Sequence, residues 1–444
     1  MSSMQLLPYK QQVSSLLRLG LPIVVGQLGM IILGLADTIM IGHHSTEELA
    51  AAAFVNNVFN LAIIFATGFS YGLTPLIGML QGGGNTQGIG RVFRNALAAN
   101  ASVAVLLTAV MYTVYCFVDK LGQPEELLPH IRPYFVLQLI SLLFIMLFNG
   151  FRQFAEVLTD TRTPMWILLG GNALNIFGNY LLIYGSFGFP EWGLFGAGVS
   201  TLVSRIVMLL VFIGVVAVAR RYKVYREAIL RSRFNRNDFI QLNALGWPIA
   251  LQMGMETAAF SLSAIMVGWL GSIPLAAHQI MISVSTIGFM VYYGMGAALA
   301  VRVSHFMGQK DFPNLRRAVN SGMGIILSLA IVASLFFYLV RTPIIYSFTE
   351  DHEVMIVVSS LIFSLIVYQF GDALQITFAN ALRGTTDVKP MMWIAFFSYF
   401  IVALPVGYLC GFTWGGGVVG VWVAFPAGLF TAGFLFWLRF RYRL

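Results

Sequence analysis

The chain has 444 residues, of which 58% are hydrophobic and only 10% are charged. Water-soluble domains are about 25% charged, so this composition excludes a soluble protein and places most of the chain in lipid. The formal net charge of +8 comes from basic residues scattered over many loops, which argues against a nucleic-acid-binding surface.

Apolar stretches of 20 residues or more recur along the chain, and each is long enough to cross a hydrocarbon core of about 30 Å as a helix. They are continuous and do not alternate with a period of two residues, which predicts helices and not barrel strands. The expected spans, in chain order, are residues 16–42, 49–80, 93–118, 131–157, 164–185, 193–219, 241–270, 275–307, 316–340, 355–383, 390–411 and 416–438.

Basic residues concentrate in the two termini and the even-numbered loops, and acidic residues predominate in the odd-numbered loops. By the positive-inside rule, we expect both termini to be cytoplasmic in a multi-pass protein of the bacterial inner membrane. The longest basic loop, residues 220–238, is also amphipathic, so we expect it to lie along the membrane surface as a linker.

Shifting the sequence by 226 residues lays matching segments of the two halves on each other without a gap, and the match spans most of each half. Because six spans separate equivalent positions, this is a parallel repeat, and it predicts two six-helix bundles around a central cavity. We expect residues 1–222 to form the N-lobe, 223–240 a basic linker and 241–444 the C-lobe. The matching segments include LGLPI at 19–23 with LGWPI at 245–249, IMIG at 39–42 with IMVG at 265–268, and LAA at 49–51 with LAA at 275–277.

Three acidic residues fall well inside expected spans, where an ionisable group indicates function unless it has a partner. Asp37, Glu256 and Asp372 are not matched by acids in the repeat, so the scaffold does not require them. Tyr368 precedes Asp372 by four residues and shares its helical face, and a carboxylate beside a phenol suits Na⁺ or a proton. A structural hydrogen bond for Glu256 and Asp372, and a solvated or capping role for Asp37, are the alternatives.

Polar residues that are not acidic also interrupt the spans. Asn175 and Asn179 lie one turn apart, and Thr201 offers a hydroxyl from the next span; a structural interhelical contact is nearly as well supported as a binding site. Arg205 and His278 are better explained as groups with structural partners inside the bundle than as substrate ligands.

Two prolines occupy equivalent repeat positions near the starts of the first and seventh spans. Pro22 and Pro248 each remove a helical hydrogen bond, so we expect local bending there. The hinge hypothesis is weaker for Pro248, because a proline in the first turn of a helix costs little.

No Walker A, zincin or G-x-S-x-G motif occurs, so the sequence supports neither ATP-driven transport nor the commoner hydrolase reactions. Cys116 and Cys410 lack a CxxC spacing, and we expect both to be buried free thiols. His43 and His44 are expected in an external loop without the spacing of a metal site.

Several motifs together resemble the multidrug and toxic compound extrusion (MATE) family. LADTIMIG at 35–42 followed by LAA at 49–51 resembles the family's first-helix signature, and DTRTPM at 160–165 and RGTTDVKP at 383–390 resemble its paired loops. The resemblance implies a twelve-helix antiporter that expels lipophilic, often cationic compounds in exchange for Na⁺ or H⁺, without a further cofactor.

The resemblance also assigns residues. Glu256, Tyr368 and Asp372 match the C-lobe cation site of the NorM-like branch, and Asp37 with Asn175 matches the N-lobe cluster. An acid found in another branch is Asn179 here, which favours the NorM-like branch and weakens a proton site confined to the N-lobe.

Two other classes of function stay open at this point. A flippase for a lipid-linked precursor belongs to the same superfamily and would need a strongly cationic cavity, whereas the charges inside the spans are mainly acidic. A membrane-embedded enzyme or a receptor would need a catalytic motif or a soluble domain, and neither is visible. No nucleic-acid or obligate protein partner is expected.

Overall fold

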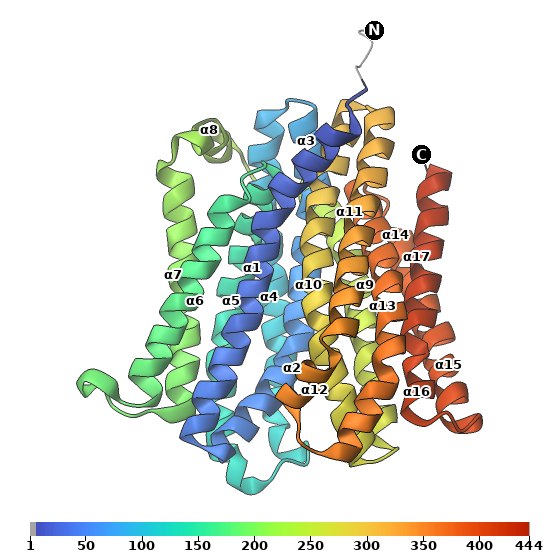
Figure 1. Ribbon diagram of the computed structural model, residues 1–444. Helices are drawn as coiled ribbons and strands as arrows, with labels where there is room; N and C mark the ends of the chain where they lie inside the picture. Colours follow the sequence, from blue (N-terminus) through green and yellow to red (C-terminus); the bar gives the residue numbers. More distant parts are fainter. Residues whose placement is uncertain (1–5, 444) are drawn as a thin grey trace. The chain divides into compact units, whose positions relative to one another are not determined.

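The computed structural model describes residues 6–443, and these fold into helices joined by turns and short loops (Figure 1). Twelve helical stretches are long and apolar enough to cross a membrane, which confirms the expected number of spans and the all-α fold class. The second and twelfth spans each consist of two consecutive helices, and the eleventh contains π-helical turns.

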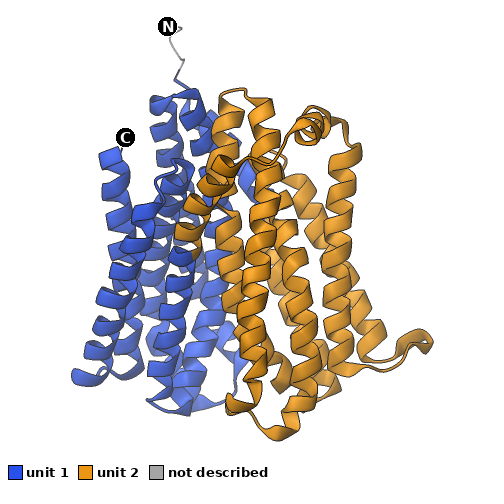
Figure 2. Ribbon diagram, turned by 180° about the vertical axis from the view of Figure 1, so that it is seen from behind, with its two compact units in different colours: residues 1–24, 251–444 blue, residues 25–250 orange. Residues whose placement is uncertain are grey.

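The described chain divides into two compact units (Figure 2). Unit 2 comprises residues 25–250, and unit 1 comprises the described part of residues 1–24 together with residues 251–444. The division falls inside α1 (Tyr9–His44) and α9 (Arg236–Gly268), two residues after Pro22 and two residues after Pro248. Each unit therefore holds the first part of one of these helices and the remainder of the other.

The other helices fall entirely within one unit. Unit 2 contains α2 (Thr46–Ser70), α3 (Leu73–Gly82), α4 (Thr86–Cys116), η1 (Val118–Lys120), η2 (Glu125–Leu127), α5 (Leu128–Val157), α6 (Arg162–Ile183), η3 (Ser186–Gly188), α7 (Gly193–Val218), η4 (Arg220–Tyr222) and α8 (Lys223–Arg231). Unit 1 contains α10 (Ser272–Gln309), α11 (Phe312–Leu339), α12 (Arg341–Phe348), α13 (His352–Gly384), α14 (Lys389–Phe396), η5 (Phe397–Ala403), α15 (Leu404–Tyr408), η6 (Leu409–Thr413), α16 (Gly417–Trp422) and α17 (Ala424–Arg443).

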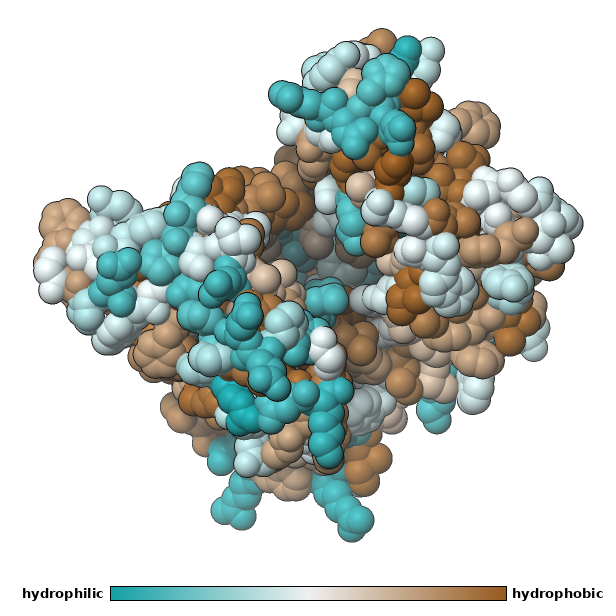
Figure 3. Space-filling view, turned by 90° about the horizontal axis from the view of Figure 1, so that it is seen from below, coloured by the Kyte–Doolittle hydropathy of each residue, from teal (hydrophilic) through white to brown (hydrophobic). Residues whose placement is uncertain are grey.

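Both units have the surface that lipid requires. Large hydrophobic side chains are exposed along the spans, for example Val105, Phe363 and Trp393 at 66%, 75% and 67%. Seen from below, hydrophilic residues gather in patches on this end, and hydrophobic residues cover much of the rest of the view (Figure 3). In unit 1 the start of α1 and the end of α17 lie at the same end, as an even number of crossings requires (Figure 1).

Small residues allow the helices of unit 2 to pack closely. A Cβ on Gly198 of α7 would lie 2.7 Å from Leu137 and 2.9 Å from Tyr134, both on α5. Beside this contact, the rings of Phe59 and Phe135 meet edge to face at 4.8 Å in the apolar core. Because lipid is as apolar as these side chains, close backbone approach and good packing hold the helices together.

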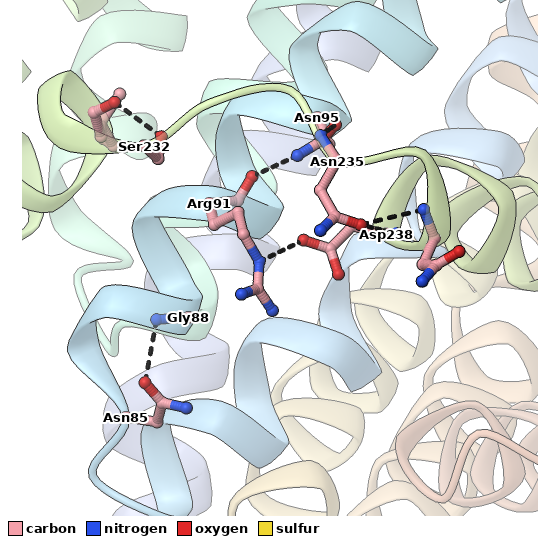
Figure 4. Close-up of polar contacts among 9 residues, drawn as sticks. Asn85, Gly88, Arg91, Asn95, Ser232, Asn235 and Asp238 are labelled. Carbon is pink, nitrogen blue, oxygen red and sulfur yellow. Dashed lines mark hydrogen bonds and ion pairs between the residues drawn. The ribbon is translucent and has the colours of Figure 1, made fainter.

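Helix α8 and the chain after it are docked on α4 within unit 2 (Figure 4). Arg91 Nε lies 2.7 Å from Asp238 Oδ2, and the backbone N–H of Asn235 donates to Asn95 Oδ1 at 2.9 Å. A Cβ on Gly90 would lie only 2.5 Å from the α8 backbone, so glycine is needed where α4 meets this helix. The basic linker is thus attached to unit 2; its expected place on the membrane surface stays a prediction.

The start of the linker is held by a second contact. Tyr222, 1% exposed, donates its hydroxyl hydrogen to Asp160 Oδ2 at 2.6 Å, and Arg221 lies 2.8 Å from the same oxygen. Burial, followed by the hydrogen bond to Asp160, raises the pKa of the Tyr222 phenol. Asp160 belongs to the first of the two paired loop motifs, so this motif anchors the linker.

The two histidines at the end of α1 are helical, which corrects the expectation that they lie in a loop. His44 Nδ1 lies 2.8 Å from Glu48 Oε2 and His44 Nε2 lies 3.0 Å from Glu191 Oε1, so the ring joins α1, α2 and the chain before α7. The apolar segment detected in the sequence ends at residue 42, whereas the helix itself continues through His44.

Two further expectations need correction. Cys116 is exposed and Cys410 is half-buried; both are free thiols, but neither is buried, because Cys116 ends α4 and Cys410 lies in the π-helical turns of η6. Pro248 is not in a first turn, because α9 already begins at Arg236. It therefore interrupts the hydrogen-bond ladder inside the helix, as Pro22 does in α1.

Candidate functional site

The polar cluster of unit 1 contains the two acids expected inside the C-terminal spans. Glu256 lies on α9, and Asp372 lies on α13 one turn after Tyr368. Asp372 is 0% exposed and Tyr368 4% exposed, so both side chains are inside the protein. Gln375, three residues after Asp372 on α13, donates to the Glu256 carboxylate, which places the two acids in one cluster.

Glu256 is held by two amides. Its Oε2 accepts hydrogen bonds from Gln252 Nε2 at 3.0 Å and from Gln375 Nε2 at 3.1 Å. Gln252 is one turn earlier on α9, and Gln375 projects from α13 one turn after Asp372. The contacts fix the carboxylate between two helices but supply no positive charge.

Asp372 lacks even this support. Neither of its carboxylate oxygens has a hydrogen-bond partner among residues 6–443. Three neutral oxygens on the same helices or on the π-helical η5 are likewise buried without a partner in this part of the chain: Gln252 Oε1, Gln375 Oε1 and Ser398 Oγ. Buried oxygens are normally paired, so this group suits a cation or a shared proton.

The hard oxygen atoms of this cluster are of the type that binds Na⁺. The described chain has no group of three or more His, Cys, Asp or Glu side chains arranged around a metal ion. A cation held in unit 1 would therefore use amide and hydroxyl oxygens besides the two carboxylates.

Aromatic side chains surround Tyr368. The rings of Phe260 and Phe425 lie 6.2 Å and 6.4 Å from its ring, both edge to face. His278 stacks on Phe425, and its Nδ1 accepts a hydrogen bond from Trp422 Nε1 at 3.1 Å. His278 thus has the structural partner that the sequence predicted, and Tyr368 is positioned by apolar packing.

The second polar cluster lies in unit 2 and contains Asp37. Asn179 Nδ2 donates a hydrogen bond to Asp37 Oδ1 at 2.6 Å. The Asn175 amide is satisfied at both ends when its Nδ2 donates to the same oxygen at 3.0 Å and its Oδ1 accepts from Thr201 Oγ1 at 3.1 Å. The structure therefore brings together the four residues predicted from the sequence.

The unit 2 cluster continues to Arg205, one turn after Thr201 on α7. Arg205 donates to Gln138 Oε1 at 3.0 Å and to Ser141 Oγ, both on α5. On the same face of α5, Tyr134 donates to Asn56 Oδ1 of α2 at 3.1 Å. Polar side chains from five helices thus form this cluster.

Sequence reasoning found the acids and the two asparagines beside Asp37 but missed the glutamines. Gln138, Gln252 and Gln375 are 4%, 2% and 2% exposed and contact the charged groups directly. A glutamine inside an apolar span was the available signal, because burial makes any polar group there costly.

Buried acids, amides and an arginine inside twelve membrane-spanning helices define the class of a polytopic membrane transporter, not an enzyme. The model of the MatE family matches residues 22–181 and 248–409, more than half of the chain. The chain belongs to this family and is a MATE multidrug transporter, which moves drug-like small molecules.

Individual relatives agree with the family assignment. Multidrug resistance protein NorM of Photobacterium profundum is 30% identical over 448 residues, covering 98% of this chain and 96% of that protein. A mutant of the Vibrio cholerae MATE transporter VcmN superposes with a TM-score of 0.88 at 18% identity, covering 98% of both chains. An outward-facing multidrug resistance MATE transporter of the MOP superfamily superposes with a TM-score of 0.88 at 20% identity, covering 99% of this chain and 98% of that chain.

Proposed function

We propose that the protein is a secondary antiporter that exports lipophilic, often cationic drugs or metabolites in exchange for Na⁺ or H⁺. The buried carboxylate of Asp372, whose two oxygens lack a hydrogen-bond donor in the described chain, carries this proposal. An uncompensated charge inside a span costs several kcal/mol, so the site favours uptake of a cation or a proton. Glu256 and Asp372 are the carboxylate ligands, and the Tyr368 phenol orients them or completes the shell.

Exchange follows from competition for one negative site. When the coupling ion binds, the charge that attracts a cationic drug is cancelled, and when the drug binds the ion is displaced. The N-lobe (residues 1–222) and C-lobe (241–444), joined by the linker 223–240, alternate in access around a central cavity. Asp37, Asn175, Asn179 and Thr201 form the N-lobe site for substrate or proton.

The distribution of basic residues supports a location in the bacterial inner membrane with both termini in the cytoplasm. This orientation places the loop that joins α3 to α4 and the docked helix α8 on the cytoplasmic side, and His44 on the external side. Export of a drug then runs from the α8 side to the His44 side.

The test measures drug release from proteoliposomes under a Na⁺ or H⁺ gradient applied separately. Glu256→Gln and Asp372→Asn should abolish gradient-dependent release of ethidium, and Tyr368→Phe should weaken ion affinity more mildly. Glu353→Gln, at an exposed acid in the first turn of α13, is the matched control. If both acid variants keep the wild-type dependence on the gradient, the coupling site lies elsewhere.

A further inference from the structure

Arg205 is a charged group inside unit 2 whose direct partners are neutral. Its guanidinium donates to Gln138 Oε1 and to Ser141 Oγ, and none of the ion pairs found in residues 6–443 includes it. Neutral partners satisfy the N–H groups but leave the positive charge in place. A charge held this way inside a membrane span requires compensation from elsewhere in the protein.

The structure connects this charge to Asp37. Thr201 precedes Arg205 by four residues, so the two side chains share a face of α7. Thr201 contacts Asn175, which together with Asn179 donates to the Asp37 carboxylate. Asp37 is thus the carboxylate that this chain of contacts joins to the face of α7 that carries Arg205.

The polar network explains why the two charges do not meet as an ordinary ion pair. Gln138 and Ser141 hold the guanidinium toward α5, whereas Asn179 and Asn175 hold the carboxylate toward α6. The cluster has one negative and one positive group, so it is neutral while Asp37 is ionised. A proton taken up by Asp37 leaves the cluster with one net positive charge.

We propose that Arg205 is the specificity-determining residue of the unit 2 cluster: a fixed positive charge that repels cationic drugs once Asp37 has been neutralised by a proton. The inference rests on the proposed antiport function. It gives proton uptake a direct electrostatic effect on the drug, because neutralising one member of the pair exposes the charge of the other.

The proposal predicts a particular dependence on the charge of the ligand. A permanently charged aromatic cation such as ethidium should bind more weakly when Asp37 is neutral, whereas an uncharged drug such as chloramphenicol should be little affected. Repulsion between the charge of Arg205 and a cationic drug bound nearby accounts for about a tenfold difference in ethidium affinity between the states with neutral and with ionised Asp37.

The test is a double-mutant cycle on Asp37 and Arg205, measured as ethidium and chloramphenicol binding to the purified full-length protein. Asp37→Asn fixes the cluster in its positive state and should weaken ethidium binding about tenfold. Adding Arg205→Gln to that variant removes both charges, so ethidium binding should recover while chloramphenicol binding stays unchanged. Because the pair is removed together, the double variant leaves no uncompensated charge inside the span.

Arg205→Lys in the Asp37→Asn background is the matched control, because it keeps the charge and should keep ethidium binding weak. If the double variant with Gln binds ethidium no better than Asp37→Asn alone, or if Lys restores binding as well as Gln does, the inference is overturned. If Asp37→Asn alone changes neither ethidium binding nor ion-driven export, the N-lobe part of the proposed function fails instead.

Discussion

Asn179 Nδ2 donates a hydrogen bond of 2.6 Å to Asp37 Oδ1, which joins the C-terminal part of α6 to the C-terminal part of α1. Here an amide supports a single carboxylate, so a change in the charge of Asp37 alters one strong contact between these two helices.

Asp37→Asn should lower drug export about tenfold or more without unfolding the protein. The amide is nearly the same shape and keeps hydrogen bonding to Asn179, but it can no longer carry a charge. Export from cells that lack other exporters, normalised to the amount of folded protein, checks this expectation. Asp119→Asn, at an exposed acid paired with Arg132, serves as control; normal export by Asp37→Asn would show that its charge is dispensable.

Tyr222→Phe should lower the free energy of unfolding of the protein by about 1–2 kcal/mol, because it leaves the Asp160 carboxylate without its phenol donor. The raised pKa of Tyr222 keeps the phenol protonated up to alkaline pH, so this loss should be constant between about pH 6 and pH 9 and shrink only above the pKa of an unfolded tyrosine, about 10. Denaturation in detergent measures the effect.

Tyr225→Phe is the matched control for Tyr222. Tyr225 also belongs to the linker region, but it is half-buried and donates to the neutral Gln81 at 3.0 Å. Its loss should therefore cost less. Equal destabilisation by the two variants would mean that Asp160 does not anchor the linker as the contacts indicate.

The stability that the His44 contacts contribute should fall as the pH rises, whereas the stability contributed by an ionised carboxylate in an ion pair falls as the pH is lowered. A neutral imidazole has a single N–H and can donate to one partner, so bonds to both Glu48 and Glu191 require the imidazolium. His130 Nδ1 lies 3.8 Å from Glu48 and adds a second basic group to the cluster. The stabilisation is therefore present at acidic pH and is lost as the pH rises and the ring loses its proton.

His44→Gln should thus lower the Tm near pH 6 and have little effect near pH 8.5, with a loss of about 0.5–1 kcal/mol at the acidic end because Glu191 is largely exposed. Thermal unfolding of the two proteins across this range measures it. His43→Gln, at the neighbouring histidine of α1, is the control and should show no such dependence. A destabilisation that is the same at both pH values would contradict the imidazolium.

The sequence predicted the fold more completely than it predicted the polar clusters. Apolar length and the 226-residue repeat were sufficient for twelve helices, because each span must satisfy its own backbone in lipid. The structure adds an equivalence that the 226-residue shift misses by one position. Thr159 and Thr386 both have a positive φ of 67°, and the aspartate after each, Asp160 or Asp387, binds an arginine.

The polar clusters could be predicted only in part. Each acid was visible because it stands alone in an apolar stretch, but its partners come from other helices whose rotation the sequence does not state. Gln375 contacts Glu256 across 119 residues, and Gln138 contacts Arg205 across 67. The π-helical turns that bring Ser398 and Tyr399 to the same region have one indirect sequence signal, Pro405, which removes the helical hydrogen bond to residue 401 inside η5 but does not state which side chains are brought together.

Pro22 and Pro248 should act as paired hinges, because each lies two residues before the point at which its helix passes from one unit to the other. A proline inside a helix removes the hydrogen bond to the residue four positions earlier and clashes with that carbonyl, which lowers the cost of bending there. Pro22→Ala restores that bond in α1 and should stiffen the helix, slow the exchange between access states and reduce the turnover of export.

Pro22→Ala and Pro248→Ala should each have this effect, and the double variant should be slower than either alone. Pro133→Ala is the matched control: Pro133 also lies inside a helix, α5, but that helix belongs entirely to unit 2, so its replacement should leave turnover unchanged. Spin labels placed on the two units and followed by distance measurements during transport would report the exchange directly. The hinge assignment fails if Pro22→Ala exchanges and exports at the rate of the Pro133→Ala control.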